Sequence, residues 1–146
     1  MTPVAAPSVG RGCGRYDARV IAAAILAVVL LGAIVVFQLA LALGAPWGAA
    51  AWGGQNPGVL PTRLRIASGV VAVVVYPLVI ALVLASAGLI GDDWLPVDGT
   101  LIMWGLTGLL GVGAVMNFFS RSRPERLWGA VALTIAMCCA IIALGV

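Results

Sequence analysis

The sequence contains no histidine and no lysine, and only five of its 146 residues are acidic. Without histidine it lacks the commonest general base and a common metal ligand, which argues against hydrolytic chemistry and against a zinc site. Charged residues make up 9% of the chain, whereas about a quarter is usual for a soluble domain. So few charges could not cover a water-soluble body of this size, and we expect lipid to cover most of it.

All eight basic residues are arginines, and they lie in short segments between apolar runs. They are Arg11, Arg15, Arg19, Arg63, Arg65, Arg121, Arg123 and Arg126. A nucleic-acid-binding protein would instead gather its basic residues on one face or stripe. We therefore predict that the arginines set a membrane topology and contact lipid headgroups, and that nucleic acid is not a partner.

Only three cysteines are present, so they cannot all pair with one another, and their spacing is not that of a metal site. Cys138 and Cys139 are neighbours in an apolar run. Adjacent helical residues point to different faces, so we predict small buried side chains there rather than a redox pair. Cys13, in Gly-Cys-Gly, is either an acylation site or without a role. The sequence predicts no metal and no cofactor.

Four long stretches without a charged residue run through the chain, at roughly 20–43, 66–90, 101–119 and 127–144. A helix needs about 20 residues to cross about 30 Å of hydrocarbon, and each stretch is close to that length or longer. None alternates like a barrel strand, and the first is too long for the apolar region of a signal peptide. The sequence therefore predicts an all-α integral membrane protein. A four-helix transmembrane bundle would form one domain over 1–146, with a short N-terminal tail at 1–17.

Polar residues at the ends of these stretches predict where helices begin. Asp17 is placed to cap the first helix, and Asp98 and Thr100 compete to cap the third. Ser122-Arg-Pro-Glu125 has the spacing of a capping box, in which the serine and glutamate side chains each accept a backbone N–H of the helix start. Tyr76-Pro77 should loosen the second helix near its middle, because proline removes one hydrogen bond.

All five tryptophans lie at predicted helix boundaries, where amphipathic rings favour the headgroup level: Trp47, Trp52, Trp94, Trp104 and Trp128. With four spans, the 44–65 and 120–126 loops share one side, which holds five arginines and Glu125. The arginine excess predicts that these loops face the cytoplasm and that both termini lie outside. The three arginines that precede the first span favour the opposite orientation.

The 44–65 segment is rich in glycine, proline and tryptophan, and no charge occurs in it before Arg63. A solvated linker would be more polar, so we expect this loop to fold back against the headgroups or to dip between helices. Its candidate contact residues are Trp47, Trp52, Gln55, Asn56, Arg63 and Arg65. Two interpretations stay open: an interfacial connector anchored by its tryptophans, or a binding site that uses Gln55, Asn56 and free carbonyl groups.

The 117–128 segment lies on the same predicted side and supplies the other candidates, which are Asn117, Arg121, Arg123, Glu125 and Arg126. Arginines beside a helix N-terminus favour an anion site, for a lipid phosphate or a small anionic ligand. In a second interpretation, Arg63 or Arg65 pairs with Glu125 and joins the two loops. In a third, these residues only cap the helix and set the topology.

The predicted spans contain few polar residues and no charged one; the polar ones are Gln38, Ser68, Tyr76, Ser86, Thr107, Asn117 and Thr134. Proton-driven exporters need an intramembrane carboxylate, so this class is disfavoured. The third span also carries Gly105, Gly108, Gly111 and Gly113. Such a face suits close helix packing, either within the bundle or against a second copy or a larger membrane partner.

Three groups of residues carry a likeness to known proteins: Gly44-Ala-Pro-Trp-Gly with Ala51-Trp-Gly-Gly, Leu60-Pro with Arg63 and Arg65, and the run from Met116 to Trp128. In these motifs, and over roughly residues 37–144, the chain resembles a family of small, uncharacterised four-helix membrane proteins of bacteria. The resemblance implies four spans in the inner (plasma) membrane and no particular activity. The alanine- and glycine-rich composition is similar to that of actinobacterial proteins.

Three function classes fit these features. We expect a non-catalytic membrane protein that binds a lipid or a small apolar ligand, or that acts as an accessory subunit of a membrane complex. One alternative is an oligomeric passive transporter or channel, assembled through the glycine-rich third span. The other is a membrane enzyme acting on a lipid or isoprenoid. Its carboxylates would be Asp92, Asp93 and Asp98, although such a cluster in a short loop is more typical of a solvated turn.

Overall fold

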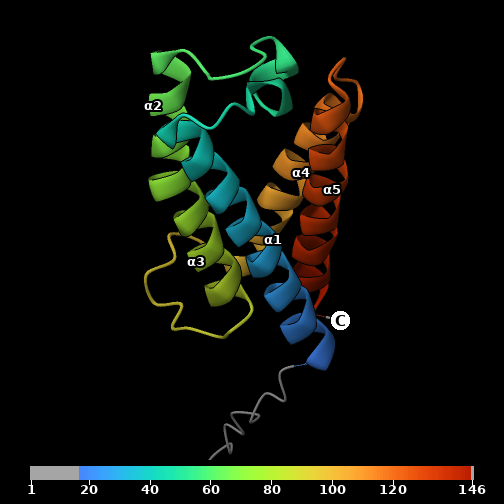
Figure 1. Ribbon diagram of the computed structural model, residues 1–146. Coiled ribbons are helices and arrows are strands. Elements are labelled where there is room, and N and C mark those ends of the chain that lie inside the picture. Colours follow the sequence, from blue (N-terminus) through green and yellow to red (C-terminus); the bar gives the residue numbers. More distant parts are fainter. Residues whose placement is uncertain (1–16, 146) are drawn as a thin grey trace, which may run out of the picture.

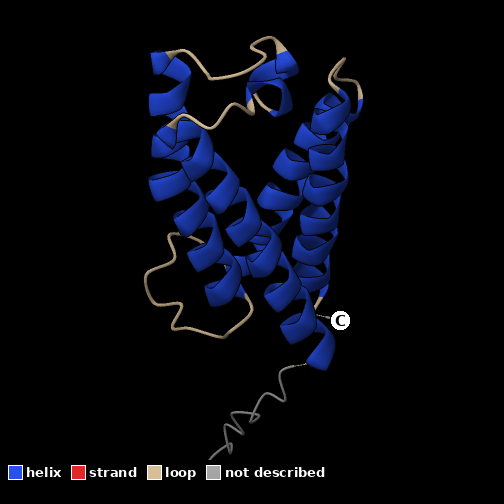
Figure 2. Ribbon diagram, viewed as in Figure 1, coloured by secondary structure: helices blue, strands red, loops and turns tan. Residues whose placement is uncertain are grey.

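The structure is a computed structural model that describes residues 17–145. Every regular element in this range is a helix, and the range contains no strand (Figure 2). In chain order the elements are α1 (Ala18–Leu43), η1 (Gly48–Ala50), η2 (Trp52–Gly54), α2 (Thr62–Val70), the π-helix η3 (Val71–Val75), α3 (Tyr76–Ser86), α4 (Gly99–Phe118) and α5 (Arg123–Leu144). Arg11, Cys13 and Arg15 lie outside the described residues, so their predicted roles stay predictions.

Four helical stretches are long and apolar enough to cross a membrane: α1, the continuous helix Thr62–Ser86, α4 and α5. The all-α fold with four such helices is therefore confirmed. The second and fourth helices begin earlier than predicted, because the predicted stretches stop at the nearest charge. Arg63, Arg65 and Glu125 are thus helical residues, near the starts of these two helices. The second also ends at Ser86 instead of near residue 90, because Gly88 adopts a left-handed φ of 69° that ends the helix.

Aspartate caps begin two of the helices as predicted. The Asp17 carboxylate accepts a hydrogen bond from the Arg19 N–H (2.9 Å), and the Asp98 carboxylate accepts one from the Thr100 N–H (2.8 Å). Asp98, and not Thr100, is thus the cap of α4. The hydroxyl and the backbone N–H of Thr100 both hydrogen-bond this carboxylate, which holds the pKa of Asp98 below its usual value.

The predicted capping box at the start of α5 is wrong. Ser122 occupies the N-cap position and Pro124 lies in the first turn, but the serine side chain makes no capping bond. Its hydroxyl donates instead to the carbonyl oxygen of Ala49 (2.5 Å), and Glu125 accepts from the backbone N–H of Gly53 (2.6 Å). These partners are more than 70 residues away in the chain. They replace the local box because the earlier loop folds onto this helix end.

The α4 and α5 helices form a closely packed hairpin, and α1 contacts both α5 and the α2–α3 helix (Figure 1). The main core lies at the end of the bundle near the termini, where small side chains of α1 let the helices approach. Its buried members are Val20, Ala23, Ala24, Ala27, Leu31, Val83, Ala87, Met103, Leu106, Ile135, Cys138, Cys139 and Ile142. Cys138 and Cys139 are thus buried and unpaired, as predicted.

Toward the opposite end, α2 and α4 diverge, and the 44–61 segment covers the helix ends (Figure 1). This loop is folded: the Gly48 N–H donates to the carbonyl of Gly58 (2.8 Å), and Leu41, Ala51 and Leu60 form a small buried cluster. A Cβ at Gly48 would lie 2.2 Å from the Asn56 carbonyl oxygen, so only glycine allows this close approach. The 44–61 loop therefore has a defined fold and is not a free linker. Because it lies over this end of the bundle, we call it the cover.

The second long helix is distorted beside Pro77, as predicted, and the distortion is a π turn. The N–H of Tyr76 donates to the carbonyl of Val71, five residues earlier, instead of to the residue four earlier. Proline cannot donate a hydrogen bond and crowds the preceding turn, which accounts for the looser spacing just before it. Val71, the first residue of the π turn, and Tyr76, the residue just after it, both line the cavity described below.

The glycine face of α4 packs against nothing else in the described chain. A Cβ added at Gly105, Gly108 or Gly111 would meet no described atom within 4 Å, whereas Gly113 lies on another side of the helix and lines the cavity described below. Close packing within the bundle is therefore not the role of this face. Packing against a second copy or a larger partner stays a prediction.

Candidate functional site

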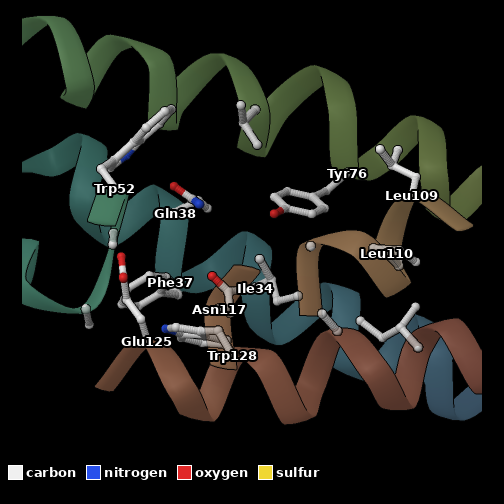
Figure 3. Close-up of a pocket in the computed structure, with 16 residues that line it drawn as sticks. Ile34, Phe37, Gln38, Trp52, Tyr76, Leu109, Leu110, Asn117, Glu125 and Trp128 are labelled. Carbon is white, nitrogen blue, oxygen red and sulfur yellow. The ribbon is translucent and has the colours of Figure 1, made fainter. Parts of the chain in front are cut away.

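A cavity of about 360 Å³ lies where the helices separate, beneath the 44–61 loop (Figure 3). Side chains from α1, from the α2–α3 helix with its π turn, from α4 and from α5 line it, and it is partly open to the outside. Ala50, Ala51 and Trp52 close it at the loop end. Because all four long helices contribute, the cavity exists only in the assembled bundle.

Most of the cavity wall is apolar, and aromatic rings hold it open. The aliphatic lining residues are Ile34, Val71, Leu109, Leu110, Ala132 and Ile135. Phe37 of α1 meets Trp128 of α5, with ring centroids 4.6 Å apart and planes tilted by 42°. These two large rings separate α1 from α5 at this level, whereas alanines bring α1 close to its neighbours in the main core.

Trp52 is the principal side chain of the cover. Its φ of 55° lies in the left-handed region, which a non-glycine residue adopts only when its surroundings enforce it. The indole Nε1 donates to the hydroxyl of Ser68 (3.1 Å), which is fully buried in α2. This bond ties the 44–61 loop to the second long helix and lays the indole across the end of the cavity.

The opposite edge of the cover is held by a group we call the loop latch: Ala49 and Gly53 on one loop, and Ser122 and Glu125 at the start of α5. The Glu125 side chain is only 5% exposed. One of its oxygens accepts from the Gly53 N–H, and the other accepts from the Ser120 hydroxyl. Charge-assisted bonds of this kind are stronger than neutral ones, so the latch fixes the cover to the helix hairpin.

The interpretation in which Arg63 or Arg65 pairs with Glu125 is wrong. Both glutamate oxygens accept from other groups, Arg65 Nε donates to the carbonyl oxygen of Ala42 (3.1 Å), and Arg63 is exposed. The two loops do meet on one side of the bundle, as predicted. Backbone and hydroxyl groups join them in place of a guanidinium.

Three neutral polar side chains also line the cavity: Gln38 of α1, Tyr76 of α3 and Asn117 of α4. In Figure 3 the Tyr76 hydroxyl points toward the amide nitrogen of Gln38, and the amide oxygen lies on the side of Trp52. That oxygen is buried and has no hydrogen-bond partner among the described residues. The cavity therefore has polar groups toward its loop end and leucines at the far end.

Trp52, Asn117 and Glu125 are the predicted contact residues that line the cavity. Trp47 does not line the cavity but stacks on Phe37, which does, with ring centroids 6.2 Å apart. The other candidates do not line it: Gln55, Asn56, Arg63, Arg65, Arg121, Arg123 and Arg126. Four of these arginines, all except Arg65, are exposed and stay candidates for headgroup contacts. In the interpretation of the 44–65 loop as a binding site, the loop side chain that contacts the ligand is therefore Trp52, and not Gln55 or Asn56.

Gln38, Tyr76 and Trp128 line the cavity but are missing from the predicted contact residues. Gln38 is the one glutamine in a long apolar run, and a polar residue inside a span is a candidate for function by itself. Tyr76 adjoins the proline that predicted a helix distortion. Both features can be seen in the sequence, but no local pattern shows that Gln38 and Tyr76, which are 38 positions apart, face each other.

The structure offers little chemistry at the other places that the sequence highlighted. Asp92 and Asp93 are exposed in the loop near the opposite end of the bundle, away from the cavity. Residues 17–145 contain no group of three or more histidine, cysteine, aspartate or glutamate side chains that could hold a metal ion.

Comparison of the chain with protein-family models, with curated proteins and with solved structures finds no match to any of them. The likeness to a family of small bacterial membrane proteins therefore stays a prediction. What this protein does has to be argued from its cavity.

Proposed function

We propose that this chain is a multi-pass protein of a bacterial inner membrane and that it binds one small, mainly apolar molecule without transforming it. The observation that carries the proposal is the cavity of about 360 Å³ built by all four long helices. Ligand pockets commonly measure about 300–1,000 Å³ and combine apolar walls with a few polar groups. The lining of this cavity has that character.

The outer faces of the helices support membrane insertion. Large apolar side chains such as Val112, Met116 and Leu127 are 61%, 70% and 71% exposed. In water such residues would form apolar patches far larger than those of soluble monomers, whereas lipid tails cover them in a bilayer. The exposed arginines near the loop latch would then lie at the level of the headgroups.

The scarcity of contacts between α2 and α4 supports entry of the ligand from within the bilayer. The loop end of the cavity is closed by Trp52 and by the loop latch, so a molecule dissolved in lipid would enter sideways between these two helices. The volume suits one small molecule or one segment of a lipid chain. A whole phospholipid would not fit.

The polar lining residues support binding over catalysis. Gln38, Tyr76 and Asn117 are neutral, and the Glu125 carboxylate already accepts two hydrogen bonds. Among the lining residues, all within the described part of the chain, no nucleophile stands beside a base. A role as an accessory subunit is compatible with the same binding site.

The outward glycine face of α4 favours a second candidate function, an oligomeric passive transporter or channel. Gly105 and Gly108 are exposed, and small residues allow a helix of another copy to approach closely. The two functions differ in what Gly108→Leu does. It would disrupt an oligomer and any flux of solute across vesicles, and it would leave ligand binding in the cavity unchanged.

The proposed function is tested by filling the cavity. Gly113 lines the cavity, and a Cβ there meets no described atom within 4 Å, so the side chain of Gly113→Leu would start in open space at the cavity wall. The matched control is Gly108→Leu on the exposed side of the same helix. Native mass spectrometry of the detergent-solubilised protein would count bound 1-dodecanol, used as a small apolar probe.

We expect the wild type and Gly108→Leu to bind one molecule of 1-dodecanol, and Gly113→Leu to lose at least about tenfold in affinity, since the side chain takes the volume of the ligand. Equal binding by all three proteins would place the probe on the outer surface. That result would overturn the proposed function.

A further inference from the structure

We infer that the ligand of the cavity is a neutral lipophilic alcohol or phenol, whose hydroxyl donates a hydrogen bond to Oε1 of Gln38. This inference rests on the proposed function, because it describes the molecule that the cavity binds. It adds the chemical group by which the ligand is recognised and the direction in which the ligand lies.

The amide oxygen of Gln38 carries the argument. It is buried on the cavity wall without a hydrogen-bond partner among the described residues. A buried carbonyl oxygen that loses water without gaining a donor is costly, and most such groups in proteins are paired. A donor brought by a ligand would satisfy it, whereas a ligand with only ethers, esters or hydrocarbon would not.

The surroundings of Gln38 specify a donor and not merely a polar group. Its amide nitrogen faces the Tyr76 hydroxyl, so the atom of the amide that is left without a partner is the oxygen (Figure 3). An amide oxygen can only accept a hydrogen bond, so the ligand has to supply the donor. Ser86 Oγ is also buried without a partner in the described chain, but it packs against Gly99 and is not among the residues that line this cavity. Gln38 therefore differs from Ser86 because its side chain lines the cavity: the oxygen itself is covered, and a small turn of the side chain would expose it to a ligand there.

Charge around the cavity excludes the common charged lipids. No lysine, arginine or histidine is among the lining residues, which all lie in the described chain. The Glu125 carboxylate lies at the loop end of the same cavity and would repel a carboxylate or a phosphate. An amine would need to lose its hydration beside a neutral amide and aliphatic walls, which is costly for a cation.

The position of Gln38 sets the direction of the ligand. It lies five residues before Leu43, the last residue of α1, which is about 8 Å along the helix axis at about 1.5 Å per residue. Leu109 and Leu110 line the cavity at the end away from Trp52 (Figure 3). The hydroxyl of the ligand would thus lie below the cover, and its apolar part would extend toward the leucines.

The test compares three probes of equal chain length: 1-dodecanol, dodecyl methyl ether and dodecane. Each is titrated against the wild type, Gln38→Met and Gly113→Leu, and bound molecules are counted by native mass spectrometry. Methionine keeps the length of the glutamine side chain and removes its acceptor. Gln38→Glu serves as a second variant, which keeps an acceptor but adds a charge.

We expect the wild type to bind the alcohol about tenfold or more tightly than the ether, which is the effect of satisfying one buried acceptor. Gln38→Met should bind the alcohol and the ether about equally, with unchanged affinity for dodecane. Gln38→Glu should retain a preference for the alcohol. Gly113→Leu should bind each of the three at least about tenfold more weakly than the wild type does.

Equal affinity of the wild type for alcohol and ether, with binding still weakened by Gly113→Leu, would overturn the hydroxyl inference and leave the proposed function intact. A preference for the alcohol that survives in Gln38→Met would also overturn it. Binding that Gly113→Leu does not affect would overturn the proposed function itself, so the two failures are distinguishable.

Discussion

The two ends of this helix bundle differ in the side chains that separate their helices. Near the termini, Ala23, Ala24 and Ala27 let α1 lie close against its neighbours, and Met103 is fully buried among them. Near the 44–61 loop, Phe37 and Trp128 meet between α1 and α5, and the helices diverge around a cavity.

This difference shows how one short bundle can combine stability with a binding site. Small residues give close packing and many dispersion contacts, which stabilise the bundle whether the outside is water or lipid. Large rigid rings at the other end prevent the same closure and leave room beside polar groups. We expect the terminal half to carry most of the stability and the loop half to carry the binding, and three changes would test that division.

The largest effect is expected from Met103→Ala, which leaves a hole in the packed half. Methionine-to-alanine changes in cores cost about 2–5 kcal/mol, and the lost contacts here are of the same kind. Thermal unfolding in detergent, followed by circular dichroism, would show a lowered midpoint.

The matched control is Met116→Ala on the same helix, where the side chain is 70% exposed. We expect this change to alter stability by less than about 0.5 kcal/mol. If both variants unfolded at the same temperature, the terminal half would not be the stabilising half.

A middle-sized effect is expected from Glu125→Ala, which breaks the loop latch. It removes the acceptor of the Gly53 N–H and the partner of the Ser120 hydroxyl, at about 1.5–3 kcal/mol for a charge-assisted bond. The cost should fall mainly on the cover, so hydrogen exchange of residues 48–54 should accelerate while α4 and α5 stay protected.

Asp93→Ala provides the comparison for Glu125→Ala, because it removes one exposed carboxylate from the loop near the other end of the bundle. It should leave exchange of residues 48–54 unchanged. Acceleration of exchange throughout the bundle in Glu125→Ala would show that the latch stabilises the whole fold and not the cover alone.

The smallest effect is expected at Asp98, the cap of α4 in the packed half. The hydrogen bonds from Thr100 lower the pKa of this carboxylate in the folded state, so the folded protein binds its proton less readily than the unfolded chain does. The cap therefore contributes its full stability above the ordinary aspartate pKa of about 3.9, and the contribution is lost as pH falls through the lowered folded pKa.

Asp98→Ala should remove that part of the pH dependence, measured as the unfolding midpoint between about pH 6 and pH 3. Asp92→Ala, in the same loop, controls for the loss of one negative charge. A midpoint that depends on pH equally in wild type and Asp98→Ala would contradict the assignment of the cap.

The sequence is informative wherever the determining interaction is local. Charge-free stretches near the length of a membrane span located the four long helices. Two of these helices nevertheless begin before the arginines at which the predicted stretches start. Asp17 and Asp98 cap helices two residues later in the chain, and Pro77 distorts the turn that precedes it. In each case the partner lies within one or two helical turns.

Local reasoning failed at Ser122 and Glu125, where the spacing of a capping box is present and the box is not formed. Tertiary packing brings the backbone of the 44–61 loop to this helix end, where the Gly53 N–H donates to Glu125 and the Ser122 hydroxyl donates to Ala49 in place of the capping bonds. The same packing left Gln55 and Asn56 away from the cavity and placed Gln38 in its wall.

The sequence by itself determined an all-helical chain with four helices long and apolar enough to cross a membrane, because hydropathy and backbone hydrogen bonding act over neighbouring residues. Only the tertiary structure decided where the helices separate and which polar groups meet there. Gln38, Tyr76, Asn117 and Glu125 come from three different long helices and the π-distorted one, and their side chains share a cavity only after those helices have packed.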